Sequence, residues 1–269
     1  MLLQDISQIT SDYQHIYLSP HFDDVVFSCG ATILRQRRAS QSVLIITVFG
    51  GLPSTASLAS PFALQLHQEM KLSPEPINVV EERRQEDSNV AACLDVDIFW
   101  LDFLDAIYRG KPARYMDSKS LFGDICVEDI HLIGSLNKTL QSVLQQAPQA
   151  KYYLPLGIGR HVDHQICSLA GLQLMQSGAN VQFYDDLPYA LLPQATEKRL
   201  HELGGFWYPT YVEIFSFLQG KGDVALCYQS QLSLFGNVLS MREAFEGYHK
   251  SLLSSHYSFY ERFWILMVS

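Results

Sequence analysis

Basic side chains are scarce in this chain of 269 residues, which has 19 Lys and Arg against 28 Asp and Glu and a formal net charge of −9. Nucleic acids and anionic membranes are bound mainly through clustered Lys and Arg. The densest basic stretch, Arg35–Arg38, is short and fits the C-terminal turn of a helix, where cations are favourable. We therefore expect no nucleic-acid partner.

Long apolar runs are also missing. No stretch reaches the ~18 apolar residues that a membrane span requires, and no basic segment followed by an apolar core opens the chain. The five cysteines are scattered without a CxxC pair, and most have apolar neighbours, which is typical of reduced core thiols in a cytoplasm. The sequence thus predicts a soluble, cytoplasmic protein with no transmembrane segment.

Segments rich in β-branched and aromatic residues alternate with helical stripes along most of the chain. Val43–Phe49 is apolar at every position except Thr47, as expected for a strand buried on both faces of a parallel sheet. Strands are predicted at 15–19, 43–49, 98–101, 151–155, 181–184 and 211–217, and helices at 22–38, 81–94, 130–146, 164–176 and 225–234. This order predicts a single α/β domain over residues 1–269, with a mostly parallel sheet and helices on both faces.

Two stretches, 50–79 and 108–127, show no clear pattern. Both follow strands, and open α/β sheets bind ligands beyond the carboxyl ends of their strands. We expect these stretches to wall a substrate pocket, with a mobile insertion of no function as the alternative.

Aromatic side chains crowd the C-terminal third. We expect them to lie in the core or in a subunit interface, so a homo-oligomer is one prediction. The residues concerned include Tyr257, Phe259, Tyr260, Phe263 and Trp264. Earlier in the chain, Asp185-Asp186 follows a predicted strand and is interpreted as a strand-ending turn, although one carboxylate could reach the pocket.

The first motif with chemical character is Ser19–Asp24, directly after the first predicted strand. His21 and Asp24 are three residues apart and share a helical face, so both side chains can reach one cation. Asp23 points in another direction and is placed to take a proton from metal-bound water as a general base.

The second motif, Arg160–His164, follows the strand predicted at 151–155. His164 would complete a ligand set of two imidazoles and one carboxylate with an open position, which suits hydrolytic Zn²⁺, and Fe²⁺ or Co²⁺ would fit the same donors. His161 can protonate a leaving amine or stabilise an oxyanion. Asp163 is expected to accept a hydrogen bond that orients an imidazole.

Both motifs resemble those of the PIG-L (LmbE-like) family of zinc-dependent de-N-acetylases, which typically read Pro-His-Pro-Asp-Asp-Glu and His-x-Asp-His. Glu82–Leu94 resembles the Arg-x-x-Glu helix of the family, and Trp100–Asp105 resembles its acidic strand end. Cys227–Gln231 resembles a late helix that reads Tyr/His-x-Ser-Gln. The resemblance covers most of the chain, from about residue 15 to 235.

The resemblance implies a Rossmann-like fold without a dinucleotide, and hydrolysis of an N-acetyl group on a GlcNAc-type sugar or a related amide. It implies that the zinc ligands are His21, Asp24 and His164 and that Asp23 is the general base. It further implies that His161 is the acidic histidine and that Asp163 tunes it. Arg83 and Asp105 fall where the family holds sugar hydroxyls. Arg84 and Asp102 compete with them for the same alignment.

The chain departs from the family pattern at Phe22 and Val25, where Pro and Glu are usual. Neither position supplies a ligand or the base, so catalysis should survive. Phe22 lacks the φ constraint of proline, and Val25 lacks a carboxylate that could order the metal loop. We therefore expect differences in metal affinity or substrate choice.

Three hypotheses follow. The first is a zinc-dependent deacetylase acting on the N-acetyl group of an amino-sugar conjugate. The second is an amidase for a larger amide conjugate, because the long patternless stretches could admit bulky acyl groups. The third is a non-catalytic Rossmann-like nucleotide-binding protein, which is disfavoured because Gly50-Gly51 and Gly157-Ile158-Gly159 are too short for the G-x-G-x-x-G signature.

Overall fold

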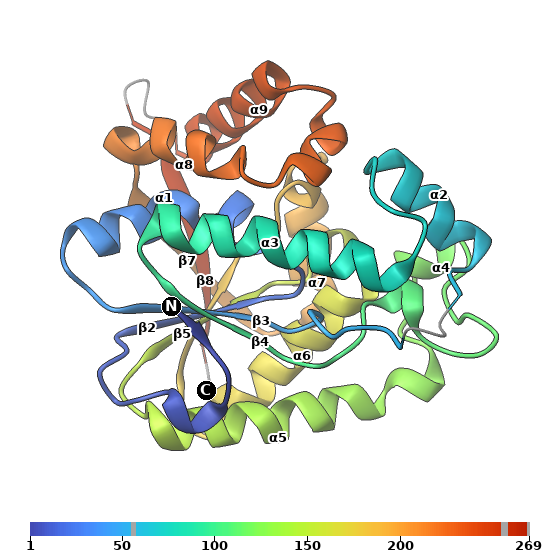
Figure 1. Cartoon of the computed structure of the whole chain (residues 1–269). Helices are drawn as coiled ribbons and strands as arrows, with labels where there is room; N and C mark the ends of the chain where they lie inside the picture. Colours follow the sequence, from blue (N-terminus) through green and yellow to red (C-terminus); the bar gives the residue numbers. More distant parts are fainter. Residues whose placement is uncertain (55–57, 254–257, 268–269) are drawn as a thin grey trace.

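A computed structural model describes residues 1–54, 58–253 and 258–267 (Figure 1). Within them, eight strands form one sheet in the order β1-β4-β3-β2-β5-β6-β8-β7. In chain order the strands are β1 Leu2–Leu3, β2 His15–Ser19, β3 Val43–Thr47, β4 Asp97–Trp100, β5 Lys151–Pro155, β6 Asn180–Tyr184, β7 Phe206–Glu213 and β8 Tyr260–Met267. The six strands from β1 to β6 pair in parallel, whereas β8 runs antiparallel to both β6 and β7.

Helices cover both faces of this sheet. They are α1 Asp24–Arg38, α2 Pro61–Glu69, α3 Pro76–Leu94, α4 Ser118–Leu121, α5 His131–Gln146, α6 Val162–Gln176, α7 Ala195–Leu203, α8 Leu218–Ala225 and α9 Val238–Ser251. In Figure 1, α1 and α3 lie on one face with α8 and α9 beyond them, and α5 and α6 lie on the opposite face. The predicted α/β architecture with a mostly parallel sheet is confirmed.

The chain reverses its direction of travel across the sheet between β2 and β5. From β2 it passes through α1 to β3 and then β4 on one side, and it later continues from β5 to β6 on the other. The two strands are direct neighbours, with Tyr17 paired to Tyr153. Such a switch point opens a crevice at the carboxyl ends of the strands, which is where open α/β sheets bind ligands.

Sequence and structure differ at several element ends. The helix predicted from residue 81 begins at Pro76, because proline is well tolerated in a first helical turn. The stretches without pattern contain α2 and the short α4. The strand predicted at 211–217 is wrong in its bounds, since β7 spans Phe206–Glu213 and includes Pro209. Proline is tolerated there because β7 lies at the edge of the sheet.

The C-terminal third departs most from the sequence prediction. Instead of a helix at 225–234, α8 ends at Ala225 and a 3₁₀ helix, η7, spans Gln229–Phe235. Gly220 and Gly222 within α8 weaken the helical signal. The elements α7, α9 and β8 were not predicted at all. β8 builds the antiparallel end of the sheet with β7, and α9 belongs to the helical cover above α1 and α3. α7 packs against the turns at Ile158–Arg160 and Tyr189–Leu191.

The cysteine prediction is partly wrong. Cys29 and Cys167 are buried, but Cys93 is exposed and Cys126 and Cys227 are half-buried. Of the C-terminal aromatics, Phe263 and Trp264 lie in the core, Phe259 and Tyr260 are half-buried, and Tyr257 is outside the described residues. Among the described helices, none combines the length and apolarity that crossing a bilayer demands.

Candidate active site

The two motifs meet at the switch point. His21 follows β2, and the second motif follows β5 through a 3₁₀ turn into the start of α6. Ser19 holds the first loop, since its hydroxyl donates to the carbonyl of His21 and accepts from the backbone N–H of Val25 at 3.1 Å. Gly157 and Gly159 have φ of 83° and 79°, a conformation that glycine adopts without strain, and so allow the sharp turn after β5.

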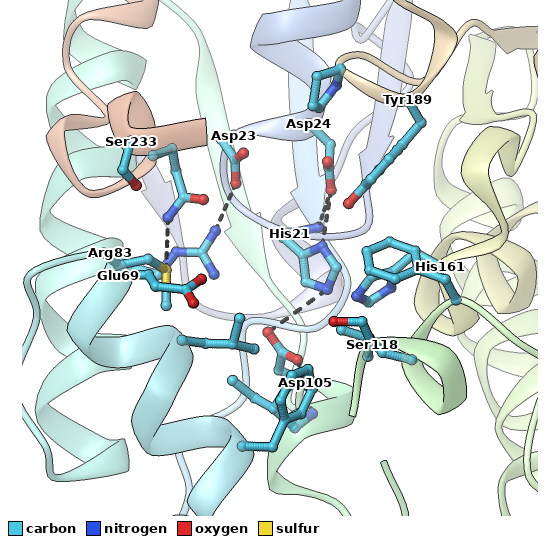
Figure 2. A pocket seen from close by; sticks show the side chains of 18 residues that line it. His21, Asp23, Asp24, Glu69, Arg83, Asp105, Ser118, His161, Tyr189 and Ser233 are labelled. Atoms are coloured by element: carbon cyan, nitrogen blue, oxygen red, sulfur yellow. Dashed lines mark hydrogen bonds and ion pairs between the residues drawn. The ribbon is translucent and has the colours of Figure 1, made fainter. Parts of the chain in front are cut away.

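One carboxylate oxygen lies between two imidazoles. Asp24 Oδ2 is 3.2 Å from His21 Nδ1 and 3.2 Å from His164 Nε2 (Figure 2 shows the first pair). All three side chains are buried. Tetrahedral coordination with bonds of about 2.0–2.1 Å separates neighbouring ligand atoms by about 3.3 Å. These two spacings are close to that value and are compatible with a shared divalent cation.

His164 Nε2 bears on the same fit. It is fully buried, and although the Asp24 carboxylate lies 3.2 Å away, it makes no hydrogen bond to any residue of the described ranges. A buried ring nitrogen without a hydrogen bond is costly, and a metal ion would satisfy it. His161 belongs to the same cluster, because one ring nitrogen from each of His21, His161 and His164 lies within 4.8 Å of the others. A second such group combines His21 with Asp105 and Asp163.

Carboxylates behind both imidazoles decide which nitrogen faces Asp24. His21 Nε2 lies 3.0 Å from Asp163 Oδ2, and His164 Nδ1 lies 2.7 Å from Asp186 Oδ1. Each carboxylate accepts a hydrogen bond from the N–H of one ring nitrogen, so that in the metal-bound protein the other, unprotonated nitrogen would face the ion beside Asp24. This is the usual carboxylate–histidine–metal arrangement.

Asp186 is a residue that the sequence interpretation missed. Its other oxygen accepts from the backbone N–H groups of Gly157 and Ile158, both at 2.9 Å. The dipeptide Asp185-Asp186 was interpreted as a turn, but it follows β6, which neighbours β5 in the sheet. That adjacency is the signal that could have found it.

Asp163 contacts a different histidine from the one that the resemblance implied. Its carboxylate binds His21, the backbone N–H of Ala106 at 3.0 Å, and Arg109 Nη1 at 2.6 Å. Only its backbone N–H meets His161, donating to Nδ1 at 3.3 Å. Burial raises the pKa of Asp163, but the Arg109 guanidinium and His21 lower it below the usual range, so the carboxylate stays ionised. Arg109 was not singled out in the sequence.

Asp23 faces the pocket beside Asp24 and pairs with Arg83, whose Nη2 lies 2.6 Å from Asp23 Oδ1 (Figure 2). Burial and the charge of Asp24 raise the pKa of Asp23 to about 6, although Arg83 and His21 act in the opposite direction. A carboxylate with a pKa near the operating pH is suited to accept and release a proton.

The competing residues differ in where they lie. Arg83 lines the pocket, whereas Arg84 donates to the carbonyl of Gly50 at 2.7 Å and covers Trp100. Asp105 lines the pocket, with Oδ2 3.7 Å from His21 Nε2, whereas Asp102 is exposed and outside it.

His161 presents its Nε2 side to the pocket. Because Nδ1 accepts from the backbone N–H of Asp163, the ring proton belongs on Nε2. Burial, with the neighbouring positive charge of His21, holds the pKa of His161 well below its usual range. His161 is therefore a neutral hydrogen-bond donor, and its ring packs edge-on against Phe122 at a centroid distance of 5.3 Å.

The two stretches without a sequence pattern supply the pocket walls, as predicted. The cavity has a volume of about 460 Å³. Phe62 and Leu66 of α2 lie on one side, and Leu121 and Phe122 at the end of α4 lie on another. Tyr189 adds a further aromatic surface next to the histidines. The site therefore combines an acidic, histidine-rich floor with apolar sides.

At the two positions that depart from the family pattern, other contacts hold the loop. The Phe22 carbonyl accepts from the hydroxyl of Tyr228 at 2.6 Å, and its ring lies under the Arg83 guanidinium at 5.3 Å. Val25 is fully buried, and its N–H donates to Ser19. The metal loop is thus held by packing and by hydrogen bonds from Ser19 and Tyr228.

The glycine pairs do not form a phosphate cradle. A Cβ on Gly51 would lie 2.6 Å from the backbone of Asp102, so glycine is required for close chain approach. Gly157 and Gly159 face the side chains of Arg199 and Tyr189. Carboxylates, including Asp24, dominate this edge of the sheet and repel phosphate, which argues against the nucleotide-binding hypothesis.

Fold and site together define an α/β protein with a buried histidine–carboxylate centre at the switch point of a mostly parallel sheet. Residues 16–175 match the family model described as GlcNAc-PI de-N-acetylase, PIG-L, which is more than half of the chain. The chain therefore belongs to the PIG-L family, as the two motifs suggested.

Two relatives carry the same name, 2′-N-acetylparomamine deacetylase. The protein from Niallia circulans is 35% identical over 189 residues, which is 65% of this chain and 66% of that protein, just under two thirds of its length. The protein from Streptomyces fradiae is 28% identical over 221 residues, or 80% of this chain and 72% of that protein. Among solved structures, the zinc-inhibited form of teicoplanin deacetylase Orf2 superposes with a TM-score of 0.80 at 24% identity, covering 94% of this chain and 98% of that one. This last likeness shows a shared fold.

Proposed function

We propose that this chain is a metal-dependent hydrolase that removes the N-acetyl group from an amino-sugar conjugate. The observation that carries the proposal is the arrangement of Asp24 Oδ2 at 3.2 Å from both His21 Nδ1 and His164 Nε2, at the floor of a pocket that Asp23 and Arg83 also line. The family and the two relatives named as 2′-N-acetylparomamine deacetylases support the substrate class.

His21, Asp24 and His164 would hold the ion. Two imidazoles and a carboxylate with an open position favour Zn²⁺, and Fe²⁺ or Co²⁺ suits the same donors. When bound, such an ion lowers the pKa of a coordinated water and polarises the amide carbonyl.

The chain's own residues supply the proton transfers. Asp23 accepts a proton from the attacking water, since its pKa of about 6 leaves it mostly ionised at neutral pH. Arg83 orients that carboxylate through its contact of 2.6 Å. His161 donates from Nε2 to the oxyanion of the tetrahedral intermediate. Asp23 then returns the proton to the departing amine, and acetate and the free amino sugar result.

A longer acyl group is the second candidate. The apolar wall formed by Phe62, Leu66, Leu121 and Phe122 favours it, because such a surface binds alkyl chains. Comparing acetyl with longer N-acyl amino sugars in one assay separates the two candidates. A higher kcat/KM for the longer acyl chains would show that a longer acyl group, and not acetyl, is the preferred leaving acyl group.

The test of the leading proposal combines metal content with acetate release across a panel of N-acetylated amino sugars. Asp23→Asn should lower turnover by about 10²–10⁴-fold, the usual range for loss of a general base, with metal stoichiometry and circular dichroism unchanged. Chelation should abolish activity and Zn²⁺ should restore it. Near-normal turnover by Asp23→Asn, or full activity without metal, would refute the proposal.

A further inference from the structure

Two cysteines that are 134 residues apart in the sequence are in contact. Cys93 Sγ lies 3.9 Å from Cys227 Sγ, and both thiols are free. Cys93 is in the last turn of α3 and is exposed, whereas Cys227 lies between α8 and η7 and is half-buried. Because an S–S bond is about 2.05 Å long, the two sulfur atoms need to approach by only about 2 Å to form a disulfide.

The cysteine pair belongs to a row of contacts between α3 and the segment 227–231. The hydroxyl of Tyr228 donates to Asp87 at 2.8 Å, and Glu86 accepts from the backbone N–H of Ser230 at 2.8 Å. Cys93 is seven residues beyond Glu86, which is about two helical turns, so both lie on the same side of α3. The segment therefore runs along this side in the direction opposite to the helix. A bond between the sulfur atoms would reinforce contacts that the fold already makes.

Both partners in this row reach the pocket. α3 carries Arg83, whose Nη2 lies 2.6 Å from Asp23 Oδ1, and the segment continues into η7, from which Gln231 and Ser233 line the cavity. α8, which packs against α3 (Figure 1), contains two glycines, and η7 is a 3₁₀ helix with weaker hydrogen bonds than an α-helix. This wall of the pocket is therefore held mainly by its contacts with α3, and a covalent bond at Cys227 would anchor it.

The surroundings give the two sulfur atoms different roles. Burial and the neighbouring Cys93 raise the pKa of Cys227 to about 11, so its thiolate is scarce at neutral pH. Cys93 is exposed and meets a soluble oxidant first. Cys227, held 3.9 Å away, is then placed to displace the group that Cys93 has acquired.

We propose that Cys93 and Cys227 are a reversible disulfide site, which joins the end of α3 to the pocket wall at η7 when the protein meets a low-molecular-weight disulfide, RS–SR. Cys93 Sγ attacks one sulfur of RS–SR, the oxidant's S–S bond breaks, and the first RSH leaves. Cys227 Sγ then attacks Cys93 Sγ of this mixed disulfide, and the second RSH leaves as the Cys93–Cys227 bond forms. The two protein thiols lose two electrons and two protons, and RS–SR gains them as two RSH molecules.

The experiment incubates the folded protein with oxidised glutathione, alkylates the remaining thiols and maps the peptides by mass spectrometry. Wild type should lose the free thiols of Cys93 and Cys227 and yield one crosslinked peptide pair, lighter than the two separate peptides by two hydrogen atoms. The same treatment should raise the Tm by about 5–10 °C, because the bond restricts the unfolded chain across a loop of 134 residues. Dithiothreitol should reverse both changes.

Two variants provide the comparison. Cys93→Ser removes an exposed side chain and is expected to fold, and its Tm should not respond to the oxidant. Cys126→Ser is the matched control, because it removes a half-buried thiol that donates to Glu128 at 2.6 Å, and it should keep the full increase in Tm.

Three results would overturn the inference: free thiols at both positions after oxidation, a glutathione adduct on Cys93 that never closes onto Cys227, or a disulfide that leaves the Tm unchanged. None of these measurements uses a substrate. Failure of the disulfide site is therefore detected separately from failure of the proposed function, which acetate release tests.

Discussion

A single carboxylate determines which nitrogen of His164 faces Asp24. Asp186 Oδ1 accepts a hydrogen bond from the Nδ1–H group at 2.7 Å, and two backbone N–H groups fix its other oxygen. Nε2 therefore faces Asp24, 3.2 Å away, and is the nitrogen that would be unprotonated when it binds a metal. A change of one atom in Asp186 would reverse that tautomer, because an amide N–H in place of the oxygen can only donate to Nδ1.

Asp186→Asn should accordingly weaken metal binding by about 10–100-fold, the usual effect of removing a carboxylate behind a ligating histidine. Competition with a chromophoric chelator measures the affinity. Asp124→Asn is the matched control, since this exposed carboxylate pairs with Arg160 away from the histidines. Equal Zn²⁺ affinity in Asp186→Asn and wild type would show that the hydrogen bond does not set the ligand geometry.

Residues of the site differ in how far sequence could predict them. His21, Asp24 and His164 come directly after strands of one parallel sheet, so their convergence follows from the order of elements. Asp186 also follows a strand of this sheet, but nothing in the order of elements identifies its partner, because packing brings it to His164.

At the scale of elements, α6 packs against β5 and β6. Its first turn carries Asp163 and His164, so this packing sets the position of the second motif at the end of the sheet. Gly171 makes this approach possible. A Cβ there would lie 2.7 Å from Leu154 Cδ2 and 3.0 Å from Phe183 Cε1. Both side chains are fully buried, so neither can move aside without disturbing the core.

Gly171→Ala should therefore lower the free energy of unfolding by about 1–3 kcal/mol through overpacking. Gly134→Ala in α5 is the matched control, because nothing lies within 4 Å of its Cβ position, and it should raise the same quantity by about 0.5–1 kcal/mol. Urea unfolding followed by circular dichroism measures both. Changes of the same sign in the two variants would contradict this account of α6 packing.

The pocket walls show why some elements escape sequence prediction. α2 is nine residues long, begins at Pro61 and buries only Phe62, Ala63 and His67. The helix is therefore too short for a repeating apolar pattern to be recognised in the sequence. Its position depends on a distant contact, in which His67 Nε2 meets the hydroxyl of Tyr108 at 2.8 Å. In contrast, β3 was predicted from the long apolar run at 43–49, and the structure buries all five residues of the strand.

At the scale of the whole molecule, Asp87 joins elements from across the chain. Its carboxylate accepts from Trp100 Nε1 at 2.6 Å and from the hydroxyl of Tyr228 at 2.8 Å. Tyr228 shares its hydroxyl with the carbonyl of Phe22, at 2.6 Å. One buried group thus connects α3, β4, the segment before η7 and the loop after β2. Each member lies in a segment that resembles a family motif, but the sequence does not indicate that these side chains meet in one buried cluster, since they are up to 206 residues apart.

Burial raises the pKa of Asp87 to about 6, against about 3.9 in an unfolded chain, although Trp100 and Tyr228 lower it. A raised carboxyl pKa means that the folded state binds the proton more tightly, so the stability from this group is present below the unfolded pKa and is lost as pH rises through about 6. Asp87→Asn removes that titration and keeps the contacts, because an amide can accept from Trp100 and donate to the Tyr228 oxygen. Urea unfolding at pH 4.5 and pH 7 should therefore show the variant gaining about 2 kcal/mol relative to wild type between the two conditions. An identical difference between variant and wild type at both pH values would mean that Asp87 does not titrate in this range.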